Sequence, residues 1–201
     1  MTSRVAIVTG ASSGLGRTMT LALLGAGHRV VAVARSAGPM DELAAEVATQ
    51  GWTQRFAPVT ADVQSPEACE QVVTAARARF GGIDALVNNA SSNAPAHYAG
   101  RFFEVPAGVW RDVMETNVNA PFQLARLVAP VLVERKWGRI VNQVTSFATM
   151  TRGGFTPYGP SKAALEAATL AWSSELAGTG VTVNAILPGG ASDTRRVTAK
   201  E

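Results

Sequence analysis

Two side chains that could move a proton stand close together in the segment TPYGPSKAAL, residues 156–165. Tyr158 and Lys162 are four residues apart, a spacing that places them on the same side of a helix. A phenol has a pKa of roughly 10, and a neighbouring ammonium can lower it by roughly 1–3 units toward the range useful at neutral pH. Pro160 lies between them and predicts that the helix has just begun, because first-turn N–H groups have no intrahelical acceptor to lose. Surface pairs often have the same spacing, so the other residues must decide.

Hydroxyl and amide side chains precede this pair. The strand pattern RIVNQVTSF ends in Thr145 and Ser146, and a hydroxyl at a strand tip can donate a hydrogen bond to a substrate carbonyl. Ser146, twelve residues before Tyr158, is our candidate if the strand bulges; Thr145 reaches the site if it does not. Asn117, in METNVNAPF, lies within a long apolar helix. A satisfied helix–helix hydrogen bond is the simplest explanation for such an amide.

A glycine-rich turn, TGASSGLG, follows the first predicted strand. Gly10, Gly14 and Gly16 have no Cβ, so the chain can bend sharply and a pyrophosphate can approach the next helix closely. The N–H groups and the dipole at the start of that helix favour an anion. Tight packing is the alternative use of these glycines, but the strand before them and the amphipathic helix after them favour a dinucleotide site.

Short strand patterns alternate with longer helical patterns, which predicts βαβ units and a parallel sheet. Several strands are continuously apolar, as expected where helices cover both faces. We therefore predict an α/β fold, a Rossmann-type doubly wound parallel sheet with helices on both faces, in one domain over residues 1–201, with its ligand at the carboxyl ends of the strands. The predicted strands are 5–8, 30–34, 54–60, 85–88, 139–144 and 181–187, and the predicted helices are 14–25, 40–50, 66–80, 107–135 and 158–178.

The composition excludes several classes of protein. Of the 201 residues, 47% are hydrophobic and 16% charged, and no apolar run approaches the roughly 18–20 residues of a membrane span. The first strand begins too early to leave room for a signal peptide. A net charge of +3 without a basic cluster predicts no nucleic-acid partner, and we predict no metal site. Cys69 is the single cysteine; we expect a buried or half-buried helix residue in a cytoplasmic protein.

The order of these motifs along the chain resembles that of the short-chain dehydrogenase/reductase family, and the resemblance covers nearly the whole chain. The resemblance rests on TGASSGLG, ADV, NNA, the helix of Asn117, the strand-end hydroxyl, the Tyr–Lys pair and VTVNAILPGG. It implies hydride transfer between a nicotinamide cofactor and a ketone or secondary alcohol. Tyr158 would protonate the developing alkoxide and Ser146 would hydrogen-bond it. Lys162 would tune Tyr158 and hold the nicotinamide ribose, while Asn117 would carry a water relay.

The resemblance also implies the cofactor contacts. Where an acidic residue would bind the ribose of NAD, the second strand ends in Ala34 and is followed by Arg35. A guanidinium can hold a 2′-phosphate, so we predict NADP(H) in preference to NAD(H). Arg17 could add to this positive field or be a solvated helix residue. The predicted cofactor-binding residues are Gly10, Ser12, Ser13, Gly14, Leu15, Gly16, Arg35, Asp62, Val63, Asn89, Ala90, Tyr158, Lys162, Pro188, Gly189 and Thr194.

Substrate and assembly are less strongly indicated. Aromatic and imidazole side chains in the loop 91–106 could line a substrate pocket or simply pack the loop: His97, Tyr98, Phe102 and Phe103. Family members usually continue beyond LPGG with a substrate-covering segment and a further strand, so we expect a fragment or a lid supplied otherwise. A non-catalytic NADP(H)-binding sensor or scaffold is the alternative function. The family implies a homodimer or homotetramer built partly on the helices 107–135 and 158–178.

Overall fold

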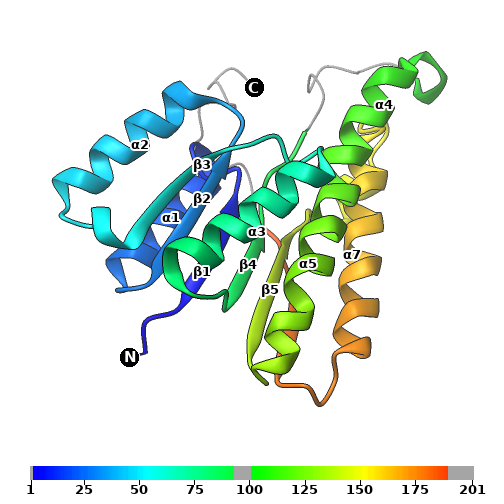
Figure 1. Ribbon diagram of the computed structural model, residues 1–201. Helices are drawn as coiled ribbons and strands as arrows, with labels where there is room; N and C mark the ends of the chain where they lie inside the picture. Colours follow the sequence, from blue (N-terminus) through cyan, green and yellow to red (C-terminus); the bar gives the residue numbers. More distant parts are fainter. Residues whose placement is uncertain (1, 93–100, 190–201) are drawn as a thin grey trace.

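The computed structural model describes residues 2–92 and 101–189, and there it forms a parallel sheet with helices on both faces (Figure 1). The strands of this part of the chain pair in the order β3-β2-β1-β4-β5-β6, and all pairings are parallel. The predicted fold class is confirmed. Because the order reverses between β1 and β4, ligands are expected at the carboxyl ends of these two strands. The strands are β1 (Val5–Thr9), β2 (Arg29–Ala34), β3 (Phe56–Thr60), β4 (Ala85–Asn88), β5 (Gly138–Gln143) and β6 (Val181–Ile186).

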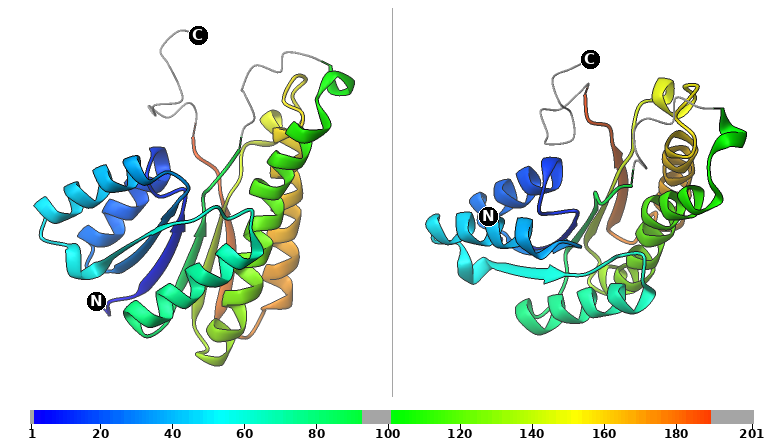
Figure 2. Two further views of the ribbon diagram at one scale, coloured as in Figure 1. Left: turned by 45° about the horizontal axis from the view of Figure 1, so that its top comes forward. Right: turned by 90° about the horizontal axis from the view of Figure 1, so that it is seen from above.

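Two groups of helices cover the sheet (Figure 2). The side chains of a strand alternate between its faces, so Ile7 packs in one core and its neighbour Val8 in the other. The core around Val8 lies under α1 and α2, and the core around Ile7 lies under α3 and α5, with α7 beside them. These helices are α1 (Gly14–Gly25), α2 (Ala37–Thr49), α3 (Pro66–Phe80), α5 (Ala120–Glu134) and α7 (Tyr158–Glu175).

The structure differs from the prediction in three places. β3 begins at Phe56 because Thr53–Arg55 form a 3-10 turn. The predicted helix 107–135 consists of α4 (Ala107–Met114), a π-helical segment (Glu115–Asn119) and α5. A short helix, α6 (Phe147–Met150), follows β5. Over residues 2–92 and 101–189, none of the helices has the length and apolar character that crossing a membrane requires.

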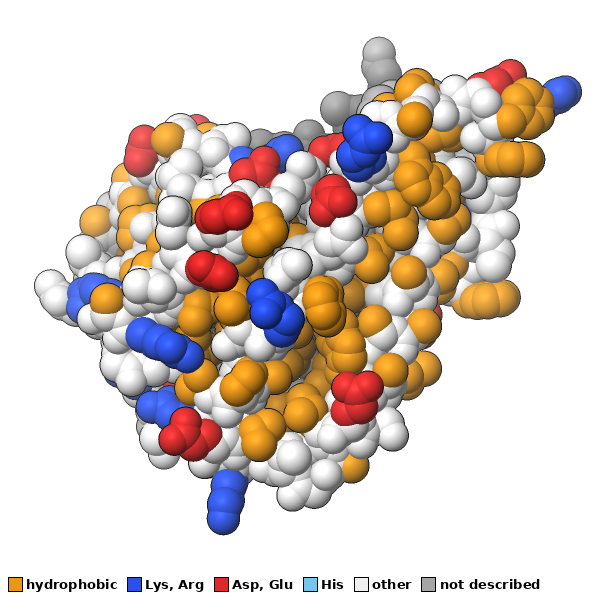
Figure 3. Space-filling model, turned by 45° about the vertical axis from the view of Figure 1, so that its right-hand side comes forward, with side chains coloured by type: hydrophobic (Ala, Val, Ile, Leu, Met, Phe, Trp, Pro, Cys, Tyr) orange, Lys and Arg blue, Asp and Glu red, His pale blue; other side chains and the backbone are white. Residues whose placement is uncertain are grey.

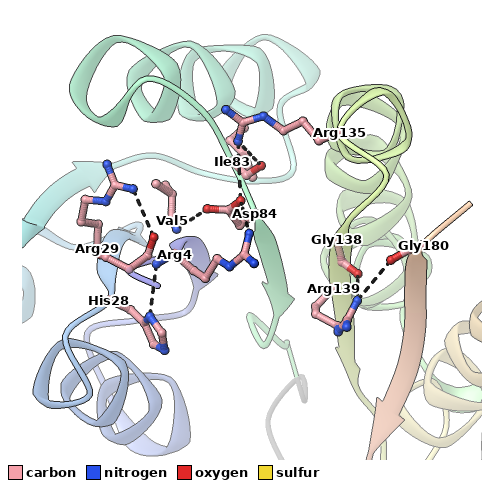
Figure 4. A network of polar contacts seen from close by, with 11 residues as sticks. Arg4, Val5, His28, Arg29, Ile83, Asp84, Arg135, Gly138, Arg139 and Gly180 are labelled. Carbon is pink, nitrogen blue, oxygen red and sulfur yellow. Dashed lines mark hydrogen bonds and ion pairs between the residues drawn. The ribbon is translucent and has the colours of Figure 1, made fainter. Parts of the chain in front are cut away.

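A cluster of charged side chains fixes the amino ends of the strands (Figure 4). Asp84 stands immediately before β4 and is only 8% exposed. Its Oδ2 accepts a hydrogen bond from the backbone N–H of Val5 at 2.8 Å, and its Oδ1 lies 3.4 Å from Arg4 and 3.5 Å from Arg135. One carboxylate thus joins β1, β4 and the end of α5. The candidate catalytic and cofactor-binding residues lie at the opposite edge of the sheet, at the carboxyl ends of the strands.

Candidate active site

The glycine turn after β1 is shaped by its contact with the end of β4. Gly10 and Gly14 have φ angles of +64° and +51°, in the left-handed region that favours glycine. A Cβ on Gly16 would lie 2.1 Å from the carbonyl oxygen of Gly10 and 2.4 Å from Nδ2 of Asn89. No larger residue fits at Gly16 unless the turn moves. The glycines therefore serve both uses that we considered from the sequence: they allow the turn to pack closely, and they leave room for an anion.

Asn89 and Thr9 hold this turn in place. Nδ2 of Asn89 donates to the carbonyl oxygens of Thr9 at 2.8 Å and Gly10 at 3.3 Å. The hydroxyl oxygen of Thr9 accepts hydrogen bonds from the N–H groups of Asn89 and Ala90, both at 3.0 Å. The predicted contact of Asn89 with a cofactor would therefore not be made by its amide nitrogen, which supports the turn.

The start of α1 suits a pyrophosphate. Its first turn contains no acidic residue, and the N-cap residue Ser13 makes no side-chain capping bond, so the hydroxyl of Ser13 is not used to satisfy the helix. Ser12, Ser13 and Leu15 are half-buried around the turn. A helix N-terminus with a backbone cradle too tight for a Cβ fits the diphosphate of a dinucleotide.

The basic residues near this turn have different surroundings. Arg17 forms an ion pair with Glu46 of α2, so its charge is already compensated. Arg35 follows β2 directly and is exposed. The structure therefore leaves Arg35, rather than Arg17, as the better candidate for a 2′-phosphate.

The predicted adenine residues follow β3. Asp62 is exposed, and its Oδ1 accepts a hydrogen bond from the N–H of Gln64 at 3.1 Å. Val63 is 6% exposed, and its carbonyl oxygen accepts from Sγ of Cys69 at 3.3 Å. Cys69 is fully buried, as predicted, and burial raises the pKa of its thiol to about 11. The thiol stays protonated and supports the turn.

Lys162 carries a buried charge at the carboxyl end of β5. Its side chain is 1% exposed, and Nζ donates to the carbonyl oxygen of Gln143, the last residue of β5, at 2.8 Å. Nζ lies 5.8 Å from the centre of the Tyr158 ring. Burial lowers the pKa of the ammonium to about 8.

The phenol of Tyr158 differs from our expectation. We predicted that Lys162 would lower its pKa, but burial raises this pKa, and a side-chain hydrogen bond with Thr145 opposes the increase. The physical reason is that desolvation disfavours phenolate, while the ammonium of Lys162 is bonded to the Gln143 carbonyl. In this state the phenol is a protonated acid at neutral pH.

The two candidate hydroxyls at the end of β5 have separate surroundings. Thr145 is half-buried and hydrogen-bonds to Tyr158. Ser146 is exposed and caps α6, because its Oγ accepts from the N–H of Thr149 at 3.3 Å and lies 3.1 Å from the Thr149 hydroxyl. The geometry thus favours Thr145 over Ser146, the residue that we preferred from spacing.

Asn117 is fully buried in the π-helical segment. Its Oδ1 accepts hydrogen bonds from the N–H of Ser92 at 2.8 Å and the hydroxyl of Ser91 at 3.2 Å. Its Nδ2 donates to the carbonyl oxygen of Ser92 at 2.8 Å and to Oγ of Ser161 at 2.9 Å. All of these bonds satisfy the side-chain amide, and the bond to Ser161 is the helix–helix hydrogen bond that we gave as the simplest explanation for Asn117.

Several predicted residues contribute little to this geometry or cannot be placed. Pro188 and Gly189 follow β6 in a loop. Thr194, His97 and Tyr98 lie outside the described residues. Phe102 and Phe103 are 74% and 63% exposed. Sequence reasoning missed Ser161 and Ser92, whose only signal was a hydroxyl next to Lys162 and two residues after Ala90, respectively.

This chain is similar in sequence to known proteins. The family model described as short chain dehydrogenase matches residues 4–201. A 3-oxoacyl-[acyl-carrier-protein] reductase of Vibrio cholerae is 32% identical over 186 residues, which are 92% of this chain and 72% of the relative. A short chain dehydrogenase of Pseudocercospora fijiensis is 34% identical over 188 residues, 92% of this chain and 59% of the relative.

Solved structures of short-chain dehydrogenases superpose on this chain. A short-chain dehydrogenase from Streptomyces avermitilis superposes with a TM-score of 0.83 at 34% identity, covering 94% of this chain and 66% of that one. A short-chain dehydrogenase/reductase from Caenorhabditis elegans, solved with cofactor, has a TM-score of 0.86 at 29% identity, covering 92% and 69%. The chain thus spans between 59% and 72% of the length of these four relatives.

The buried ammonium predicts a pH dependence of stability. The pKa of Lys162 is about 8 in the folded protein, against 10.5 ordinarily, so between these values the unfolded chain binds more protons and stability rises with pH. The free energy of unfolding of the wild type should increase relative to Lys162→Met by up to about 3 kcal/mol between pH 8 and 10.5. Urea unfolding at a series of pH values measures this difference. Lys136→Met, at an exposed lysine, is the control and should run parallel to the wild type; a parallel curve for Lys162→Met would contradict the buried charge.

Proposed function

The chain belongs to the short chain dehydrogenase family, and on that premise we propose that it transfers a hydride between NADP(H) and a ketone or secondary alcohol. One observation carries the proposal. The ammonium of Lys162 is fully buried, donates to the carbonyl oxygen of the last residue of β5, and lies 5.8 Å from the centre of the Tyr158 ring. A phenol beside such a charge can exchange a proton with a carbonyl oxygen.

The residues around the glycine turn fit the cofactor. The N–H groups at the start of α1 would hold the pyrophosphate, Arg35 would hold the 2′-phosphate, and Asp62 and Val63 would lie near the adenine. When bound, the nicotinamide ring supplies or accepts the hydride. The chemistry left to the protein is orientation and movement of the proton.

Tyr158 supplies that proton in the direction of reduction. Its raised pKa keeps the phenol protonated at neutral pH, so it can donate to the oxygen of a carbonyl as negative charge develops there. The ammonium of Lys162, whose pKa is about 8, stabilises the phenolate that remains and can return a proton to it. We therefore assign Tyr158 as the general acid and Lys162 as its electrostatic partner.

We assign the hydroxyl that binds the carbonyl to Thr145. A side-chain hydrogen bond from Thr145 opposes the rise in the pKa of the Tyr158 phenol, whereas the Ser146 hydroxyl caps α6. A donor placed beside the general acid stabilises the same oxygen as it becomes negative. Thr145 thus takes the role that we first predicted for Ser146.

The proposal is tested by the oxidation of NADPH in the presence of a panel of ketones, with 3-oxoacyl thioesters included because of the named relative. We expect NADPH-dependent turnover with at least one ketone. Tyr158→Phe should lower kcat by roughly 10²–10⁴-fold, the usual contribution of a general acid, and leave binding of NADPH within about threefold of the wild type. Absorbance at the cofactor band measures the first effect, and fluorescence titration the second.

Matched hydroxyl variants complete this test. Thr145→Ala should lower kcat by roughly 10²-fold, Thr145→Ser should retain most of it, and Ser146→Ala should change it by less than about threefold. The opposite order would return the role to Ser146. Tight NADPH binding with no turnover of any ketone would favour the sensor or scaffold instead.

Cofactor preference depends on the charge of Arg35. Arg35→Ala should raise the KM for NADPH roughly 10–100-fold, because charge-assisted hydrogen bonds to the 2′-phosphate are lost, while the KM for NADH changes little. Arg17→Ala is the control, since Arg17 is paired with Glu46. Steady-state kinetics with both cofactors measure the effect. Equal changes for NADPH and NADH would contradict the assignment of Arg35.

Assembly and compartment complete the proposal. Hydrophobic side chains gather on the face that includes α4 and α5 (Figure 3). On these helices and α7, Trp110, Phe122 and Leu170 are 44%, 47% and 69% exposed. Such a patch is expected to be covered by another protein surface, and we propose a second copy of this chain in a homodimer or homotetramer. Cys69 is a free thiol, in keeping with a reducing cytoplasm.

A further inference from the structure

The carboxylate of Asp112, on α4, joins two loops that are far apart in sequence. Its Oδ1 accepts a hydrogen bond from Nε2 of Gln64, in the turn after β3, at 2.6 Å. Its Oδ2 accepts a hydrogen bond from the hydroxyl of Ser92, in the loop after β4, at 2.7 Å. The side chain is half-buried. No step of the proposed reaction uses this residue.

The hydrogen bonds continue from Ser92 to the catalytic helix. The backbone N–H and carbonyl of Ser92 both bond to the amide of Asn117, each at 2.8 Å. The same amide donates to Oγ of Ser161 at 2.9 Å, and the Ser161 hydroxyl donates to the carbonyl oxygen of Tyr158 at 2.7 Å. An unbroken chain of hydrogen bonds therefore runs from Asp112 to the first residue of α7.

In the other direction the chain reaches the proposed adenine site. The N–H of Gln64 donates to Oδ1 of Asp62 at 3.1 Å. Nε2 of Gln64 also donates to the hydroxyl oxygen of Thr116 at 2.8 Å, and this hydroxyl donates to the carbonyl oxygen of Asp112 at 2.9 Å. Gln64 is thus held by both the side chain of Asp112 and the π-helical segment.

An ionised carboxylate is the group that this position requires. Both neighbours, Ser92 and Gln64, are donors, and a carboxylate can accept from both at once. These two hydrogen bonds, followed by the charge of Arg35, lower the pKa of Asp112. An asparagine would present one NH₂ group toward a donor, and an alanine would leave both donors without this acceptor.

We propose that Asp112 is a positioning residue that couples the adenine side of the cofactor site to the helix that carries Tyr158. The proposal rests on the proposed function for its kinetic consequence, but the coupling itself is a property of the hydrogen bonds. Loss of the carboxylate releases Ser92 from Asp112 and weakens the support of Asn117 and Ser161. Tyr158 then samples orientations in which its phenol does not face the substrate.

The test exchanges donor and acceptor between Asp112 and Gln64. Asp112→Asn replaces one of the two acceptor oxygens by an NH₂ group, and Gln64→Glu places two carboxylates against each other, so each should lower kcat by roughly tenfold. The double variant Asp112→Asn with Gln64→Glu restores a donor–acceptor pair and should recover kcat to within about threefold of the wild type. The KM for ketone should change by less than about threefold in all variants. Asp41→Asn, at an exposed aspartate of α2, is the control.

A second readout is independent of turnover. The N–H of Ser92 is protected by Oδ1 of Asn117, so its hydrogen exchange, followed by NMR, should accelerate by at least about tenfold in Asp112→Asn and return toward the wild-type rate in the double variant. A purely structural role would lower the melting temperature of the single variants without moving kcat measured well below it.

The outcomes separate the two proposals. If the wild type reduces no ketone, the proposed function fails, and the exchange of Ser92 still tests the coupling. If kcat and Ser92 exchange in Asp112→Asn both stay within about twofold of the wild type, or if the double variant restores neither, the coupling through Asp112 is overturned.

Discussion

The buried ammonium of Lys162 is the constraint on which the candidate site depends. A charge removed from water is costly unless it meets a partner, and here Nζ donates to the carbonyl oxygen at the end of β5. That bond requires α7 to begin beside this strand end. The first turn of the helix then brings Tyr158 to Thr145, and the depressed pKa of Lys162 is the measurable sign of the arrangement.

Polar contacts, as well as apolar packing, determine the position of α7 on the sheet. Asn142, fully buried on β5, accepts from Nδ2 of Asn88 and donates to the hydroxyl oxygen of Thr169 on α7, both at 2.8 Å. Because a buried polar group tolerates few arrangements, this ladder fixes the helix along the sheet. Asn117 and Ser161 do the same at the start of the helix. The side chains of Tyr158 and Lys162 are thus positioned by strands, helices and a short loop together.

The sequence predicted the fold better than it predicted side-chain directions. Short strand patterns between longer helical patterns predicted the six strands, and the glycine spacing predicted the turn. Both predictions follow from local rules. The different surroundings of Ser146 and Thr145 depend on α6, a helix of four residues that is too short to leave a periodic pattern. The direction of the Tyr158 pKa shift depends on burial by distant segments, and the use of Asp112 depends on Gln64 and Ser92, which are far from it in sequence.

The most direct test of the central claim follows the hydride itself. Protein supplied with a ketone and with NADPH deuterated at both C4 positions of the nicotinamide should form an alcohol with one deuterium on its carbinol carbon, seen by mass spectrometry. Unlabelled alcohol, or bound cofactor that yields no alcohol from any ketone, would contradict hydride transfer from the nicotinamide to the carbonyl carbon by this protein.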